Sequence, residues 1–172
     1  DDSFQFAKVV IVRVLGDRLP ENEAERPAVV KSIAQCLREL GEYAGRGIAV
    51  SIEMHGSFTD PHYSMEVVRQ ADLSNLGLVF NGVFPVGRNW KYTLPAGAAS
   101  IKPFYDMIRP HLTSIHHHEL EKPTELPYWQ EFFRLMKQDG YAGYVANEAA
   151  YTGPDPEKVL RMYTALFQAL SA

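Results

Sequence analysis

The stretch Ile48–Gly56, with the sequence IAVSIEMHG, decides the fold. Its first residues are apolar and partly β-branched, which is typical of a strand buried in a parallel sheet. The run then ends in two ionisable side chains, Glu53 and His55. This order predicts a buried strand whose carboxyl end opens into a functional site.

Three further apolar runs end in polar side chains in the same way. They are Leu78–Phe80 before Asn81, Leu112–Ile115 before His116-His117-His118, and Tyr144–Ala146 before Asn147-Glu148. A first strand is expected at Phe6–Leu15, buried on both faces. Because helix-length segments separate the strands, the crossovers are long enough for parallel pairing, and all carboxyl ends then share one edge.

Helical spacing and terminal residues place the intervening helices. Pro27 is expected in the first turn of a helix that ends near Ala44, and an Asp155-Pro156 pair is expected to start the last helix. The remaining helices are expected around Tyr63–Gln70, near Ala98–Ile108, and from Thr124 or Glu125 to Asp139. Apolar stripes on three of them are expected to face the core: Val29, Val30, Ile33, Leu37 and Leu40; Trp129, Phe132, Phe133 and Met136; and Val159, Leu160, Tyr163, Leu166, Phe167 and Leu170.

Length and composition bound the class of protein. A chain of 172 residues is expected to be a single α/β domain, residues 1–172. We expect no membrane segment, and the net charge of −4 argues against nucleic acid as a partner. The single cysteine, Cys36, excludes an intramolecular disulfide, which fits a reducing, cytoplasmic compartment. Its side chain is expected to be buried in a helix. We expect no signal peptide, and a chain that begins at Asp1 is expected to have its natural start upstream.

Two architectures fit this order of elements. One is an open, doubly wound sheet of five parallel strands, and the other is the back part of a (β/α)8 barrel. Because five strands do not close a barrel, the physical argument alone favours the open sheet.

Side chains from three strand ends form a candidate metal site. Glu53, His116 and Glu148 would converge at one rim and offer two carboxylates and an imidazole. This set suits Mn²⁺, Co²⁺, Mg²⁺ or Zn²⁺, and the lack of a thiolate argues against a structural zinc site. Alternation along the strand would send His116 and His118 to one face and His117 to the other.

Two other side chains have two interpretations each. Arg13, the interior charge of the first strand, is either a paired structural arginine or a group that reaches a substrate oxyanion. Trp90 lies in the long segment 81–99, where it either lines a substrate pocket or anchors the loop on the body of the protein.

Three short motifs then resemble a known family. They are Glu53-Met-His55-Gly56, the histidine in SIHHHEL (His116), and the Y-x-G-x-x-x-x-E pattern of Tyr141–Glu148, followed by the sequence DPEKVL. In this order they resemble the xylose isomerase-like TIM barrels, the sugar phosphate isomerase/epimerase superfamily. The resemblance covers essentially the whole chain. It implies an incomplete (β/α)8 barrel that holds strands 4 to 8, the C-terminal portion of the barrel.

The resemblance also implies a function. The chain would be a divalent-metal-dependent isomerase or epimerase of a carbohydrate, with Glu53, Asn81, His116 and Glu148 as metal ligands. Glu53 and Glu148 would also transfer the proton, and His55 and His118 would contact the substrate hydroxyls or support the ligands. Such a metal polarises a carbonyl and stabilises an enediolate.

The sequence departs from the family at the sixth strand. Asn81 stands where the family usually has an aspartate, and the histidine often found shortly after that aspartate is missing, with Phe84 in this region. A neutral amide would hold the metal more weakly. The first alternative is therefore a sugar-binding or regulatory barrel without catalysis, and the second, less favoured, is a nuclease like the apurinic-site endonucleases. A homo-oligomer stays open, because an incomplete barrel leaves a sheet edge for another chain to cover.

Overall fold

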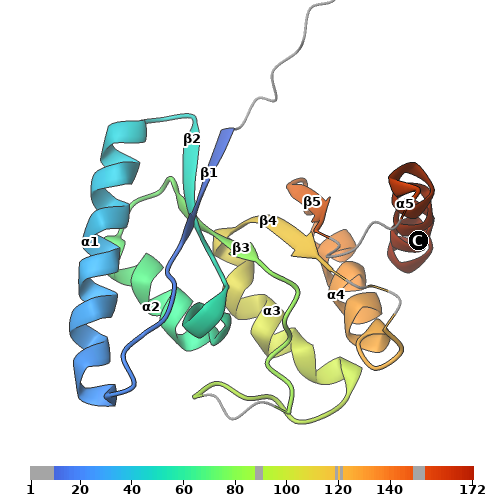
Figure 1. Ribbon diagram of the computed structural model, residues 1–172, viewed down its shortest axis with the longest axis horizontal. Helices are drawn as coiled ribbons and strands as arrows, with labels where there is room; N and C mark the ends of the chain where they lie inside the picture. Colours follow the sequence, from blue (N-terminus) through green and yellow to red (C-terminus); the bar gives the residue numbers. More distant parts are fainter. Residues whose placement is uncertain (1–9, 88–90, 119, 121, 149–153) are drawn as a thin grey trace, which may run out of the picture. The chain divides into compact units, whose positions relative to one another are not determined.

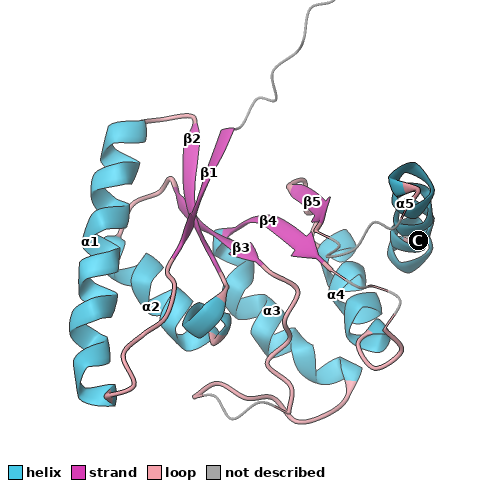
Figure 2. Cartoon of the chain, in the orientation of Figure 1, coloured by secondary structure: helices cyan, strands magenta, loops and turns pink. Residues whose placement is uncertain are grey.

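The computed structural model describes residues 10–87, 91–118, 120, 122–148 and 154–172. Strands and helices alternate along the chain (Figures 1 and 2). The strands are β1 (Val10–Leu15), β2 (Ile48–Glu53), β3 (Leu76–Phe80), β4 (Leu112–His117) and β5 (Tyr144–Asn147). The helices are α1 (Arg26–Ala44), α2 (Pro61–Ala71), α3 (Lys102–Ile108), α4 (Leu126–Gln138) and α5 (Pro156–Ser171), and short 3₁₀ turns include Ala98–Ile101 before α3. None of the described helices has the length and apolar content needed to cross a membrane.

The strands form one parallel sheet in the order β1-β2-β3-β4-β5. Val10 lies opposite Ile48 and Leu15 opposite Glu53, so the carboxyl ends of β1 and β2 coincide. In the pair β4-β5, Ser114 lies opposite Tyr144. The prediction of an α/β protein with a five-stranded parallel sheet is therefore confirmed.

Contacts group the chain into two compact units, residues 1–79 and 80–172. In the first unit, α1 packs on β2 and α2. A proline in the first turn fixes the start of α1, and Val30, Ala34 and Leu37 form the buried face of this helix. The neighbouring helix α2 is capped at its start by Asp60, whose side chain accepts a hydrogen bond from the His62 amide at 2.9 Å.

The second unit is built on aromatic rings. Phe80, at the end of β3, lies 5.0 Å from Phe132 and 5.3 Å from Phe104, measured between ring centroids. Trp129 contacts Phe80 and Phe84 from α4. These tilted and edge-on pairs are the favourable geometries for aromatic side chains. The prediction that the aromatic residues of α4 belong to the core is confirmed, and Phe84 belongs to the same core.

One prediction about burial was wrong at the first strand of the sheet order. In β1, Val12 is 42% exposed and Leu15 is 56% exposed, although the strand was expected to be buried on both faces. β1 is the first strand of the sheet and pairs with β2, so one side of it has no neighbouring strand among the described residues. Residues 6–9 of the expected strand lie outside the described residues.

Three helical positions are also exposed against expectation. They are Cys36 and Leu40 on α1 and Leu160 on α5. Cys36 directly precedes the buried Leu37, and one residue along a helix turns the side chain by about 100°. The cysteine therefore points away from the buried stripe. Leu40 and Leu160 lie at the margins of their stripes, where the packing of neighbouring elements decides burial.

Candidate functional site

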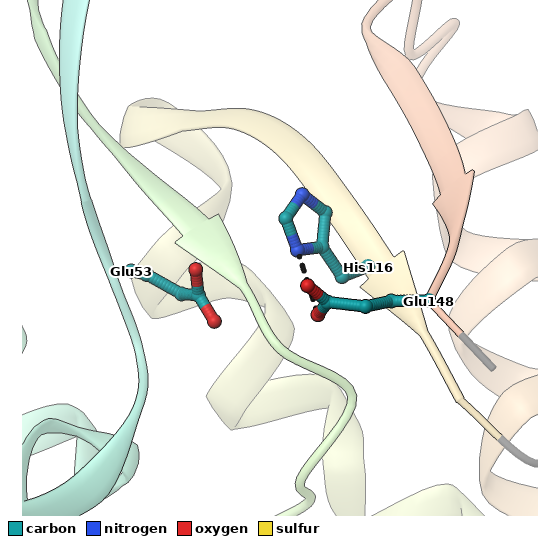
Figure 3. A group of neighbouring side chains, drawn as sticks. All are labelled: Glu53, His116 and Glu148. Carbon is teal, nitrogen blue, oxygen red and sulfur yellow. Dashed lines mark hydrogen bonds and ion pairs between the residues drawn. The ribbon is translucent and has the colours of Figure 1, made fainter. Parts of the chain in front are cut away.

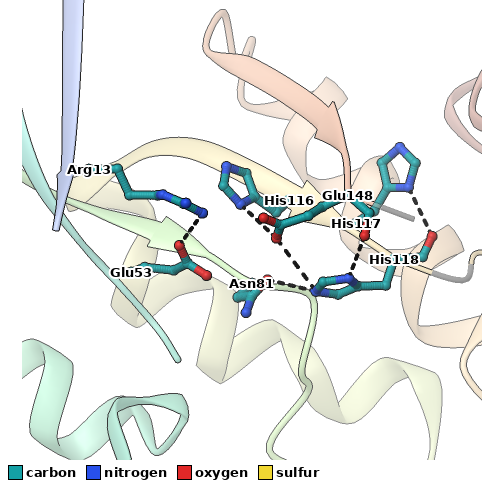
Figure 4. Close-up of polar contacts among 7 residues, drawn as sticks. All are labelled: Arg13, Glu53, Asn81, His116, His117, His118 and Glu148. Carbon is teal, nitrogen blue, oxygen red and sulfur yellow. Dashed lines mark hydrogen bonds and ion pairs between the residues drawn. The ribbon is translucent and has the colours of Figure 1, made fainter. Parts of the chain in front are cut away.

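In the first unit, the end of β2 carries a buried carboxylate paired with an arginine. The side chain of Glu53 is only 3% exposed, and its Oε2 accepts a hydrogen bond from Arg13 Nη1 at 2.6 Å (Figure 4). Arg13 lies on β1 opposite Ser51, so its long side chain reaches along the sheet to the next residue on the same face. Of the two interpretations of Arg13, the structure therefore has the ion pair, a short charge-assisted hydrogen bond.

Close backbone packing fixes the carboxyl ends of β1 and β2. A Cβ atom at Gly16 would lie 2.4 Å from Cδ2 of Phe58, so only glycine fits there. The Ser57 amide donates to the Asp17 carbonyl at 3.3 Å, and Ser57 Oγ accepts from the Leu19 amide at 2.9 Å. The predicted substrate contact His55 lies at this rim, with its side chain exposed.

In the second unit, the ends of β4 and β5 bring together a histidine and a carboxylate. Nδ1 of His116 lies 3.2 Å from Oε2 of Glu148 (Figure 3). The parallel register pairs His116 with Ala146, and the Glu148 amide continues the ladder by donating to the His117 carbonyl at 2.9 Å. The His116 side chain is 15% exposed and that of Glu148 is 44% exposed. The pair is therefore held by the sheet and open to a ligand on the Glu148 side.

His118 connects three strand ends of the second unit. Its Nε2 lies 2.7 Å from Oδ1 of Asn81, which follows β3, and its Nδ1 lies 2.9 Å from the carbonyl oxygen of Glu148, which follows β5 (Figure 4). Its Nε2 is also 4.0 Å from Oε2 of Glu148. Asn81 is buried, so His118 supplies a hydrogen-bond partner for a side-chain amide that is shielded from water.

The partners of His118 restrict its proton positions. Nδ1 faces a carbonyl oxygen, which only accepts, so Nδ1 carries a proton. In the neutral ring Nε2 then accepts from the amide nitrogen of Asn81, with the amide group turned over; only the doubly protonated, cationic ring would donate to the Asn81 oxygen. Both arrangements use both ring nitrogens of His118 in hydrogen bonds. This histidine is therefore a support for Asn81 and for the end of β5.

His117 points to the opposite face, as the alternation predicted. It is 4% exposed, and its ring lies 6.4 Å from Phe167 in a parallel stack and 6.3 Å from Trp129, edge-on. Tyr163 of α5 completes this environment at 6.0 Å. His117 thus belongs to the core, and the other two histidines of the run belong to the rim.

Gly82 brings the chain after Asn81 against the end of β4. Its φ is +67°, and a Cβ atom there would lie 3.0 Å from the His116 carbonyl oxygen and 3.0 Å from Cζ2 of Trp129. Glycine adopts this left-handed conformation without a steric penalty. The same residue type therefore permits both the turn and the close approach that places Asn81 beside His118.

The spacing of His116 and Glu148 suits two adjacent ligands of one cation. Two bonds of about 2.1 Å that meet at 90–109° place their donor atoms about 3.0–3.4 Å apart. The observed 3.2 Å between Nδ1 and Oε2 falls in this range. An imidazole and a carboxylate together are also ordinary ligands of Mn²⁺, Co²⁺ and Zn²⁺.

Several features of the site were missed or left open by the sequence. The hydrogen bond between Asn81 and His118 was not foreseen, and the glycine that follows Asn81 was its only signal. Trp90, a predicted substrate contact, lies outside the described residues.

No protein-family model matches this chain, and no curated protein matches it.

Proposed function

We propose that this chain is a divalent-metal-dependent isomerase or epimerase of a sugar or sugar phosphate, working by proton transfer through an enediolate. The observation that carries the proposal is the His116–Glu148 pair at the carboxyl ends of β4 and β5. The resemblance of the strand-end motifs to the xylose isomerase-like barrels supports the same conclusion. In this proposal the chain is the C-terminal part of a (β/α)8 barrel, about strands 4 to 8.

The proposed ligands are the three side chains drawn in Figure 3. Glu53, His116 and Glu148 can each offer one ligand atom to a cation. Asn81 would add a neutral oxygen, since a carbonyl oxygen can accept from His118 and still bind a cation through its second lone pair. Hard, divalent ions such as Mn²⁺, Co²⁺ and Mg²⁺ suit this mainly oxygen set, and Zn²⁺ is also compatible with it.

Each carboxylate has a distinct environment for its part in the reaction. The bound metal would polarise the substrate carbonyl and lower the cost of removing the neighbouring proton. Glu53 is almost fully buried, and its Oε2 accepts a hydrogen bond from Arg13 in the metal-free protein. Glu148 is more exposed, and its Oε2 is oriented by His116. The two glutamates would take the proton from one carbon and return it to the substrate.

A second candidate is a sugar-binding barrel without catalysis. Two observations favour it: Asn81 brings no charge, and the Glu53 carboxylate is already paired with Arg13. Both reduce the negative charge available to a cation. A site of this composition could bind the hydroxyl groups of a sugar through hydrogen bonds alone.

The first experiment is a calorimetric titration of metal-stripped protein with Mn²⁺ and Co²⁺. We expect saturable binding to one site, weakened at least tenfold in Glu148→Gln. Glu157→Gln on α5 is the matched control, because it removes the same charge from an exposed ion pair with Arg161. Absence of binding in the folded wild-type protein would contradict the proposal.

Proton exchange separates the two candidates. Aldoses and ketoses are incubated with the protein in heavy water, and exchange at the carbon next to the carbonyl is followed by NMR. If the chain is an isomerase, we expect proton exchange that requires the metal and that is lost in Glu53→Gln and Glu148→Gln. Sugar binding without exchange, unchanged by chelation, would favour the binding protein.

A further inference from the structure

We infer that Arg13 is a built-in counter-cation for Glu53, and that a divalent metal binds by displacing its guanidinium from this carboxylate. The inference rests on the proposed metal site and adds a rule for how that site binds its ion. It uses the geometry of one pair of side chains on β1 and β2.

The burial of Glu53 creates the need for a positive partner. Its side chain is 3% exposed at the end of a strand, and an ionised carboxylate at such a position is costly unless a positive charge compensates it. Arg13 supplies this charge through a 2.6 Å hydrogen bond to Oε2. The guanidinium thus keeps the carboxylate in place at the strand end when no metal is bound.

The two partners differ in how easily they can leave. The Arg13 side chain is 42% exposed and lies on the first strand of the sheet, so its head can move into water while its stem stays on the surface. The Glu53 side chain is almost fully buried and has no such route. A metal that approaches Glu53 therefore exchanges with the more exposed guanidinium and leaves the buried carboxylate where it is.

Competition between the two cations predicts the sign of a mutational effect. A guanidinium and a divalent ion on one carboxylate repel each other, so part of the metal's binding free energy is spent on displacing Arg13. Removing the guanidinium leaves a buried carboxylate without this partner, and a metal then gains more from binding. If Arg13 instead served only to orient Glu53, its removal would weaken metal binding.

The test is a calorimetric Mn²⁺ titration of wild type, Arg13→Gln and Arg13→Met. We expect Arg13→Gln to bind Mn²⁺ at least tenfold more tightly than wild type. Arg38→Met is the matched control: it removes one positive charge as well, but from an ion pair with the exposed Glu42 on α1, and it should change the affinity less than twofold. In a Glu53→Gln background, removal of Arg13 should have no effect on affinity.

Thermal unfolding gives a readout that does not depend on the titration. Without metal, Arg13→Gln should melt at a lower temperature than wild type, and saturating Mn²⁺ should raise its melting temperature more than that of wild type. Glutamine keeps a hydrogen-bond donor near Glu53, so this variant can be examined even where Arg13→Met fails to fold.

The outcomes separate this inference from the proposed function. If wild type binds Mn²⁺ and Arg13→Gln binds it equally or more weakly, the inference is wrong and the metal site stands. If neither protein binds, both are wrong. If only Arg13→Gln binds, the inference is supported, and the wild-type protein is not a metal-dependent enzyme.

Discussion

Gly82→Ala should lower the free energy of unfolding more than a glycine substitution elsewhere that has the same backbone strain. Gly82 has φ +67° and lies between the His116 carbonyl and Trp129. Gly140, two residues after the end of α4, has φ +65° and nothing within 4 Å of the position of a Cβ atom. The two variants therefore share the conformational penalty, and only Gly82→Ala adds a steric contact.

The structure gives approximate magnitudes for both variants. An alanine in the left-handed region costs about 1–2 kcal/mol, which is the whole effect expected for Gly140→Ala. At Gly82 the new methyl group would lie 3.0 Å from a backbone oxygen and 3.0 Å from an indole ring. Overpacking of this kind costs a further ~1–3 kcal/mol, so we expect about 2–5 kcal/mol in total for Gly82→Ala.

The assay is urea unfolding followed by circular dichroism, with both variants measured beside wild type. For a protein of this size each kcal/mol lowers the melting temperature by about 2–4 °C, so thermal unfolding offers a second estimate. Because the contact involves the His116 carbonyl, Gly82→Ala should also weaken Mn²⁺ binding, while Gly140→Ala should not. Equal destabilisation by the two substitutions would refute the contact between the Gly82 turn and the end of β4.

Three further predictions concern charge, ionisation and exposure. Asn81→Asp should tighten Mn²⁺ binding about tenfold or more, because it replaces a neutral ligand with a carboxylate beside His118; an unchanged affinity in calorimetry would place the cation away from Asn81. Burial raises the pKa of Tyr105 to about 12, and Asp139 adds to the shift. Since an unfolded tyrosine ionises near pH ~10, the folded protein retains this proton longer and loses stability as the pH rises from about 10 to about 12. Tyr105→Phe should reduce that loss in urea unfolding across this range, and identical pH profiles would count against it. Cys36 is exposed, so it should react with a thiol reagent in the native protein as fast as in the urea-unfolded chain, apart from differences in thiolate fraction; protection in the native state would contradict the exposure.

The sequence by itself predicted the elements of the fold because their signals are local. Ile48–Glu53, Leu76–Phe80, Leu112–His117 and Tyr144–Asn147 all form strands in the expected places. Apolar runs bounded by glycines or polar residues are sufficient to define such strands. Period-two alternation also separated His117 from the other two histidines of its run, because each residue along a strand reverses the side-chain direction.

Proline and aspartate positions were equally informative. The proline in the first turn of α1 and the Asp155 cap of α5 are where they were expected, and the Asp155 side chain accepts a hydrogen bond from the Lys158 amide at 2.9 Å. These features depend on one to four neighbouring residues. The amino-acid sequence alone is therefore sufficient to predict these helix starts.

Tertiary structure alone decided which side chains meet. The contacts Arg13–Glu53 and Asn81–His118 join residues 40 and 37 positions apart, and no local pattern specifies them. The exposure of Leu15, Leu40 and Leu160 likewise depends on whether another element covers that side of the strand or helix. Periodicity fixes the direction in which a side chain points, but burial and pairing are set by what the fold brings to that position, and that follows only from the packing of the whole chain.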